Sequence, residues 1–344
     1  MPKINRIGVL GCGFFAQNHL HAWTDLKSHG VEIVAVCDTD PGKAAKAAAE
    51  FGGVPYNDAR EMFSTANLEL VDIVTQVGSH RPLVELAIGA GVATIIQKPF
   101  GPTLSDCVAM MEIARAGGVP LAVHENFRFQ PPLKEIKAIL DSGEIGTPNW
   151  GRVSFRTGYD IYAGQPYLRT ERKFVIADLG AHVLDLARFY FGEVEQVSAQ
   201  TQQRSSDIAG EDTATMLLRH RSGAVSVVEC TYEARRLPDP FPQTIVEIEG
   251  SDGSVVLREE YQLHITSRGK TRTITIDPPV GAWMERPWHI VQNSVVDTCR
   301  HILEALRQDR APSVAAADNL KTMALCEAAY VSAANGQTAI PSFA

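Results

Sequence analysis

Short apolar runs alternate with helical segments along the first 125 residues. The runs are nearly continuous in apolar side chains, which is typical of strands in a sheet covered on both faces. Strands are expected at 4–10, 31–37, 71–75, 92–96 and 119–123, and helices at 14–28, 41–51, 82–90 and 104–116. Strands that alternate with helices form parallel βαβ units. The pattern therefore predicts an α/β domain over residues 1–124.

The pattern changes after His124. Several later runs alternate apolar and polar residues, as an antiparallel sheet with one solvated face does. Strands are expected near 149–158, 194–203, 211–219, 224–233, 243–249, 254–258, 261–267 and 271–276, and helices near 131–140, 178–191, 287–308 and 318–334. Residues 125–344 are therefore predicted to form an α+β domain with a large, mainly antiparallel open sheet. The two terminal helices of this domain could also pack against the first domain.

Composition narrows the class of protein. The 344 residues carry a net charge of −8 and are 45% hydrophobic, values typical of a globular chain. No basic run is present, so nucleic acid is not expected as a partner. No apolar run reaches the roughly 18 residues that span a bilayer. Six scattered cysteines without CxxC spacing favour reduced thiols and a cytoplasmic location.

A glycine-rich turn follows the first predicted strand. Gly11, Gly13 and Ala16 form a G-x-G-x-x-A pattern that opens a helix, the context in which this motif binds a dinucleotide pyrophosphate. The loop residues Phe14 and Phe15 are included in the predicted cofactor site. Asp38 ends the second strand, where a carboxylate accepts hydrogen bonds from ribose hydroxyls and repels a 2′-phosphate. The sequence predicts NAD, with NADP less favoured.

Two histidines in the helix after this turn are weighed as metal ligands. His19 and His21 are two residues apart, so their side chains diverge by about 200° around a helix. No third ligand is near in the sequence, and no metal site is predicted.

Three motifs occur in order: the fingerprint at 11–16, Gln97-Lys98-Pro99 after the run at 92–96, and Asp178-x-x-x-His182 in the second half. This set resembles the glucose–fructose oxidoreductase / inositol dehydrogenase / MocA family over nearly the whole chain. Gln97 departs from the glutamate that the family usually has there. The local sequences at 11–23, 74–80, 97–101 and 124–130 are similar to those of the family's sugar dehydrogenases that act on D-apiose and related aldoses.

The resemblance implies that Lys98, Asp178 and His182 are catalytic, with His182 favoured as the base. The residues themselves are consistent with this, because positions four apart on a helix share a face and an imidazole beside a carboxylate can accept a hydroxyl proton near neutral pH. It also implies that His80, Gln97 and Lys98 lie at the cofactor. The same three catalytic residues are expected to bind the substrate, with Asn126, Arg128 and Gln165.

The expected reaction is NAD-dependent oxidation of a hydroxyl of a small sugar or polyol: an aldose gives a lactone and a cyclitol gives a ketone. Two alternatives remain on the same scaffold. One is a glycoside-cleaving enzyme that uses NAD without net redox change. The other is a non-catalytic sugar or dinucleotide sensor, which Gln97 alone favours.

The resemblance further implies a homodimer or homotetramer that meets through the open sheet. Val225, Val227, Ile245 and Ile248 are the residues expected at that interface.

Overall fold

The computed structural model describes residues 4–343, and these form two compact units. The first unit contains the residues up to Asn126 together with Ser294–Leu320, and the second contains Phe127–Asn293 together with the residues from Lys321. The two C-terminal helices, α9 (His289–Arg307) and α10 (Ala316–Asn335), therefore contribute residues to both units. Within the described residues, no helix combines the length and the apolar character that crossing a membrane requires.

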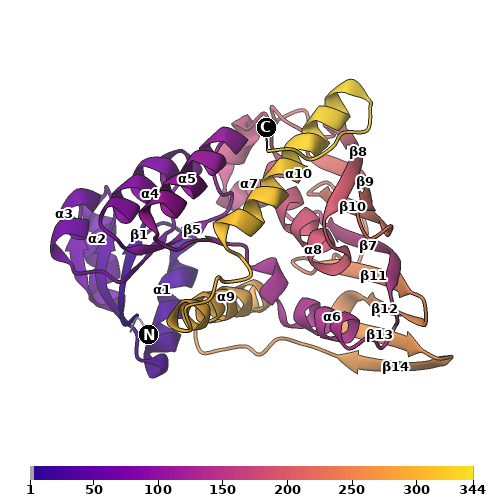
Figure 1. The fold of residues 1–344 in the computed structure, drawn as a ribbon, viewed down its shortest axis with the longest axis horizontal. Coiled ribbons are helices and arrows are strands. Elements are labelled where there is room, and N and C mark those ends of the chain that lie inside the picture. The colour runs from indigo at the N-terminus through magenta and orange to yellow at the C-terminus, as the bar shows by residue number, and fades with distance from the viewer. Residues whose placement is uncertain (1–3, 344) are drawn as a thin grey trace. The chain divides into compact units, whose positions relative to one another are not determined.

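The first unit is a six-stranded parallel sheet in the order β3-β2-β1-β4-β5-β6. Helices cover both of its faces, with α4 and α5 on one and α1 and α9 on the other (Figure 1). Its strands are β1 Arg6–Leu10, β2 Glu32–Cys37, β3 Val54–Tyr56, β4 Leu70–Ile73, β5 Ala93–Gln97 and β6 Leu121–His124. Its helices are α1 Ala16–Asp25, α2 Pro41–Phe51, α3 Ala59–Thr65, α4 His80–Gly89 and α5 Leu104–Gly117. This order is that of a Rossmann fold, which confirms the predicted parallel α/β fold, and it places a topological switch point between β1 and β4.

One strand and one helix of this unit were missed from the sequence. β3 is only three residues long, is largely exposed and contains Pro55. A short edge strand buries little apolar surface, so it has no apolar run to reveal it. α3 begins where the Asp58 side chain accepts the backbone N–H of Arg60, and its seven residues are too few for a clear helical period.

The second unit is built on an eight-stranded sheet in the order β14-β13-β12-β11-β7-β10-β9-β8. Every neighbouring pair is antiparallel except β7 with β10. The strands are β7 Pro148–Arg156, β8 Val194–Gln202, β9 Thr213–His220, β10 Val225–Thr231, β11 Ile245–Gly250, β12 Gly253–Leu257, β13 Gln262–Ser267 and β14 Lys270–Thr275. The helices are α6 Pro131–Asp141, α7 Ile161–Gly164 and α8 Ala181–Phe191. All eight predicted strands are present, and the mainly antiparallel character is confirmed.

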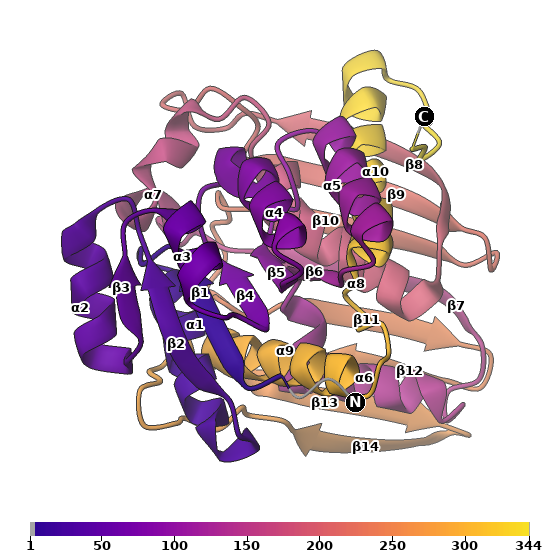
Figure 2. The same ribbon diagram turned by 60° about the vertical axis from the view of Figure 1, so that its left-hand side comes forward.

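One face of this sheet carries the core of the unit. α8 packs against β7 and β10 on that face (Figure 2). Buried and exposed residues alternate along β9, so the opposite face is left open. Ile248 is fully buried and Ile245 only half-buried. Residues three apart on a strand point to opposite faces. The assignment of Ile248 to the open face was therefore wrong.

Candidate active site

The loop after β1 has the geometry that a bound pyrophosphate requires. Gly11 has φ 91°, and a Cβ atom on it would lie 2.3 Å from the carbonyl oxygen of Val74, so only glycine fits. A Cβ atom on Gly13 would meet nothing within 4 Å, which leaves open space beside the backbone. α1 starts after Phe15, whose side chain makes no capping hydrogen bond. The N–H of Asn18 donates to the carbonyl oxygen of Phe15, and no side-chain cap occupies the start of the helix, so the loop fits an anion such as a dinucleotide pyrophosphate.

Asp38 is held next to this loop. Its Oδ2 accepts the backbone N–H of Cys12 at 2.8 Å, and its Oδ1 accepts that of Asp40 at 2.9 Å. Each carboxylate oxygen has a second lone pair, so both can accept a further hydrogen bond. The half-buried carboxylate therefore suits the ribose hydroxyls of NAD, and its charge disfavours the 2′-phosphate of NADP.

Lys98 follows the last residue of β5, at the carboxyl edge of the sheet. It donates its backbone N–H to Oε1 of the buried Gln97 at 2.6 Å. His80 is fully buried nearby, and its two ring nitrogens lie 3.2 Å from the carbonyl oxygens of Phe100 and Thr75. Burial lowers the pKa of His80 and keeps the ring neutral. A neutral ring carries one N–H, so His80 donates to only one of these two carbonyl oxygens at a time.

Asp178 and His182 lie on either side of a change in helix type. Asp178 is in a π-helical turn, Ile176–Gly180, which continues directly into α8. A regular helix was expected from Asp178; π turns inside helices are frequent at functional sites. The Tyr232 hydroxyl donates to Asp178 Oδ2 at 3.0 Å. The His182 ring stacks on Phe127 with centroids 3.9 Å apart and planes at 4°. Both side chains are therefore oriented by neighbours from the same unit.

Two polar side chains hold the start of the π turn. Glu211 accepts the backbone N–H groups of Phe174 and Ile176. The Tyr330 hydroxyl accepts the N–H of Ala177 at 3.0 Å and donates to Glu211 at 2.8 Å. Because the N–H groups at a helix start have no partner within the helix, these bonds fix where the helix begins. They therefore fix the position of Asp178 as well.

Comparison with known proteins identifies the family to which the chain belongs. Residues 5–125 match the oxidoreductase family with an NAD-binding Rossmann fold, and residues 133–256 match the GFO/IDH/MocA C-terminal domain. The chain belongs to the Gfo/Idh/MocA oxidoreductase family. This membership confirms the resemblance drawn from the three motifs, the fold class and NAD as the cofactor.

Relatives of this oxidoreductase are similar over nearly its whole length. A D-apiose dehydrogenase of Paraburkholderia graminis is 50% identical over 96% of this chain and 88% of the relative. Another, from Rhizobium rhizogenes, is 45% identical over 96% of this chain and 95% of the relative. The solved structure of an oxidoreductase from Agrobacterium radiobacter, in complex with NAD⁺, L-tartaric acid and magnesium, has a TM-score of 0.95 and 44% identity, covering 98% of both chains.

Arg128 is buried and forms an ion pair. Its guanidinium contacts both carboxylate oxygens of Asp185 on α8, one of them at 2.6 Å, and it lies over the ring of Phe189. Asp185 also accepts the Thr322 hydroxyl at 2.8 Å and lies 3.6 Å from Arg188. These contacts bind the segment at Phe127 to α8, which carries His182.

The buried pair gives a prediction for stability. Replacing Asp185 by alanine leaves Arg128 and Arg188 buried without their common carboxylate. The free energy of unfolding, measured by urea denaturation, is expected to fall by about 3–5 kcal/mol. Glu327→Ala is the control, because Glu327 pairs with Lys173 at the exposed surface, and such pairs contribute about 0–1 kcal/mol. Equal losses in the two variants would contradict a structural role for the Arg128–Asp185 pair.

The remaining predicted substrate residues also have partners in their own units. Asn126 donates its side-chain amide to the Ser294 hydroxyl at 2.7 Å and is buried. Gln165 accepts the hydroxyl of Tyr167 at 2.7 Å and is half-buried. Their assignment to the substrate stays a prediction.

His19 and His21 are separated by the helix, as their spacing predicts. His21 packs edge-on against Phe51, whereas His19 faces inward toward His124 and Cys299. One ligand-type atom of each of these last three residues lies within 4.8 Å of the others. These neighbours come from distant parts of the sequence, so spacing alone did not reveal them. The same is true of Tyr232, Glu211 and Tyr330.

Proposed function

We propose that this oxidoreductase oxidises the anomeric hydroxyl of D-apiose, or of a closely related aldose, to the lactone with NAD⁺. Two relatives that carry the name D-apiose dehydrogenase, at 50% and 45% identity over 96% of the chain, are the observation that carries the proposal. Lys98, Asp178 and His182 act together on the reacting carbon. The held carboxylate of Asp38 and the open space at Gly13 support binding of NAD.

The chemistry requires a hydride acceptor, a proton acceptor and a donor to the reacting oxygen. Bound NAD⁺ supplies the hydride acceptor. His182 takes the hydroxyl proton while the C–H bond breaks and the C=O bond forms, which gives the lactone, NADH and one proton. The Lys98 ammonium donates a hydrogen bond to the oxygen as negative charge develops on it. The ring of His182 is held by Phe127, and Asp178 is oriented by Tyr232.

The test is the formation of NADH, followed at 340 nm with purified protein. Apiose, xylose, arabinose, glucose, galactose and inositols are supplied one at a time with NAD⁺ or NADP⁺. Turnover of apiose with NAD⁺ and formation of its lactone are expected. Turnover of an inositol and of none of the aldoses would show that the substrate is a cyclitol rather than an aldose. Methyl glycosides of the same sugars are assayed in parallel, and their cleavage without accumulation of NADH would identify a glycoside-cleaving enzyme instead of a dehydrogenase.

Asp38 gives a prediction for cofactor choice. Asp38→Asn keeps an oxygen that accepts the N–H of Cys12 but removes the negative charge. A hydrogen bond to a charged group contributes about 1.5–3 kcal/mol, so kcat/KM for NAD⁺ is expected to fall about 10- to 100-fold. The repulsion of the 2′-phosphate is also lost. The ratio of kcat/KM for NAD⁺ to kcat/KM for NADP⁺ should therefore fall by at least the same factor. Unchanged preference would mean that Asp38 does not face the ribose.

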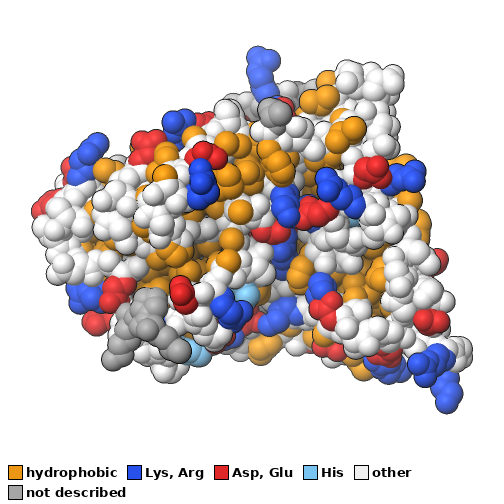
Figure 3. Space-filling view, viewed as in Figure 1, with side chains coloured by type: hydrophobic (Ala, Val, Ile, Leu, Met, Phe, Trp, Pro, Cys, Tyr) orange, Lys and Arg blue, Asp and Glu red, His pale blue; other side chains and the backbone are white. Residues whose placement is uncertain are grey.

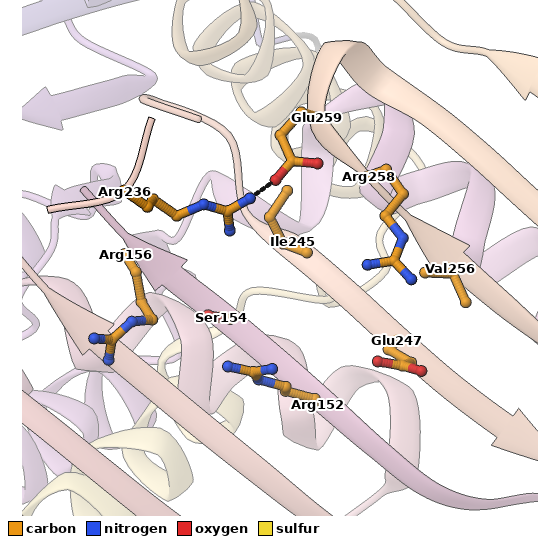
Figure 4. A pocket seen from close by; sticks show the side chains of 9 residues that line it. All are labelled: Arg152, Ser154, Arg156, Arg236, Ile245, Glu247, Val256, Arg258 and Glu259. Atoms are coloured by element: carbon orange, nitrogen blue, oxygen red, sulfur yellow. Dashed lines mark hydrogen bonds and ion pairs between the residues drawn. The ribbon is translucent and has the colours of Figure 1, made fainter. Parts of the chain in front are cut away.

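We further propose a homodimer or homotetramer joined through the open face of the eight-stranded sheet. Leu217 and Val225 are 50% and 36% exposed on this face, and Val227 and Ile245 are half-buried. Beside them is a hollow of about 290 Å³ whose side chains include Arg152, Arg156, Arg236, Arg258, Glu247 and Glu259 (Figure 4). A surface that carries both charges and apolar residues can pair with a copy of itself.

Light scattering tests this assembly. The mass in solution is expected to be a multiple of 37.4 kDa. Leu217→Glu should reduce it to the single chain, whereas Val331→Glu, at a similarly exposed valine on α10, should not. A monomeric parent protein would overturn the proposal.

In the face seen in Figure 3, basic and acidic side chains are interspersed, in keeping with a small-molecule substrate rather than a polyanion.

All six cysteines are buried reduced thiols in the structure. This supports the further proposal of a cytoplasmic, reducing location.

A further inference from the structure

A buried hydrogen-bonded chain leads from β4 to the peptide of Lys98. Oε1 of Gln97 accepts the backbone N–H of Lys98, and its Nε2 lies 3.3 Å from Nε2 of His19 on α1. Nδ1 of His19 lies 2.8 Å from Oδ2 of Asp72 in β4. Trp23 donates its indole N–H to the same oxygen at 2.8 Å. His19, Trp23 and Asp72 are fully buried.

The direction of each bond in this chain is determined. A backbone N–H can only donate, so the oxygen of the Gln97 amide faces Lys98 and the NH₂ group faces His19. Nε2 of His19 must then accept, and its proton lies on Nδ1, which donates to Asp72. The side-chain N–H groups of His19 and Trp23 both point at Oδ2 of Asp72, so the carboxylate of Asp72 is the acceptor. The contact between Nε2 of Gln97 and Nε2 of His19 therefore needs a neutral His19.

The other titratable groups around His19 cannot supply a compensating charge. The ring of His124 on β6 lies at 47° to that of His19, with centroids 4.3 Å apart, and burial lowers the pKa of His124 to about 3. Cys299 on α9 lies 3.7 Å from Nε2 of His124, and burial raises the pKa of its thiol well above the usual value. Both groups are uncharged near pH 7, so Asp72 carries the one charge of this cluster.

We propose that Gln97 is a positioning residue that requires the neutral, Nδ1-protonated form of His19 and thereby fixes the peptide that carries Lys98. Its amide donates to His19 with one end and accepts from Lys98 with the other. A carboxylate in its place can accept from Lys98 but cannot donate to His19. The glutamate that the family usually has here is thus incompatible with this chain's neutral histidine. The catalytic part of this inference rests on the proposed role of Lys98, whereas the protonation state of His19 does not.

Gln97→Glu makes the cluster dependent on one additional proton. With His19 protonated, the imidazolium lies between two carboxylates and every bond is made. Once that proton leaves, the carboxylate introduced by the substitution faces the lone pair of His19 in a buried site, which is repulsive. The folded variant therefore binds one proton more than the unfolded chain at neutral pH. The contribution of this proton to the free energy of unfolding is therefore present at low pH and is lost as the pH rises through the raised pKa of the cluster.

The experiment compares the parent protein, Gln97→Glu and Gln97→Met from pH 6 to 9 with NAD⁺ present. For Gln97→Glu, the parent-to-variant ratio of kcat for the sugar should rise about tenfold per pH unit above that pKa, with a parallel fall in Tm. Gln97→Met lacks the extra charge, so its loss of kcat should not depend on pH. The matched control is Gln308→Glu, at an exposed glutamine of the same unit, and it should behave as the parent.

A second readout is independent of catalysis. In ¹⁵N-histidine-labelled protein, with His19 assigned by His19→Gln, the parent should show the neutral Nδ1–H form throughout and Gln97→Glu an imidazolium at low pH. An imidazolium in the parent, a pH-independent ratio for Gln97→Glu, or one zinc ion per chain held by His19 would overturn the inference. If the parent oxidises no sugar, the Tm and the spectrum still decide the state of His19, and only the proposed function fails.

Discussion

Lys98→Met should lower kcat for the sugar by about 10²–10⁴-fold while the KM for NAD⁺ stays nearly constant. The methionine keeps the length of the side chain but removes the ammonium, for which we propose a hydrogen bond to the oxygen as charge develops on it. Positioned donors of this kind contribute that much to kcat. The backbone N–H of Lys98, which donates to Gln97, is retained, so the loop should keep its conformation. The measurement is steady-state formation of NADH, with NAD⁺ binding followed separately by calorimetry.

The control for this variant is Lys46→Met, at an exposed lysine of α2. It removes the same charge from the same unit and should leave kcat unchanged. A loss confined to KM for NAD⁺ in Lys98→Met would show that Lys98 binds the cofactor without assisting the chemistry. A kcat within twofold of the parent would remove Lys98 from the proposed reaction.

The fold was predictable because its signals are local. The buried strands of the Rossmann sheet are mainly apolar runs, as in Leu70–Ile73, where Asp72 is the one polar residue. α2 is delimited by Asp40, Pro41 and Gly52 in the sequence itself. The eight strands of the second unit were found because half-buried strands alternate along the sequence, as β9 does. β3 and α7 were missed because elements of three and four residues have too few positions to show a period.

The site was predictable only as far as its motifs are contiguous. Gly11, Gly13 and Asp38 were found because the strand–turn–helix context is local and the motif has a mechanical reason. Tyr232 is 54 residues from Asp178, and Asp72 is 53 residues from His19, so neither partner follows from spacing. A signal for Asp72 did exist: a carboxylate within an otherwise apolar buried strand needs a partner. The pairing of Arg128 with Asp185 likewise depends on tertiary contacts that a single sequence does not contain.

His182→Gln is the second variant for which a large loss is expected. Glutamine keeps a polar group of similar length but cannot take the hydroxyl proton, and general bases contribute about 10²–10⁴-fold to kcat. The glutamine amide can still hydrogen-bond the sugar hydroxyl, so KM for the sugar should change less than kcat does. The control is His264→Gln, at a half-buried histidine of β13 in the same unit.

The combination of this variant with Lys98→Met decides whether the two residues serve one reaction. Residues that act on the same transition state are far from additive, so the double variant should lose little more kcat than the worse single variant. Losses that multiply would mean that Lys98 and His182 contribute to separate steps, for example cofactor binding and proton transfer. The same measurement at several pH values separates their roles: the base sets the pH dependence of kcat, so that dependence should disappear in His182→Gln and persist in Lys98→Met.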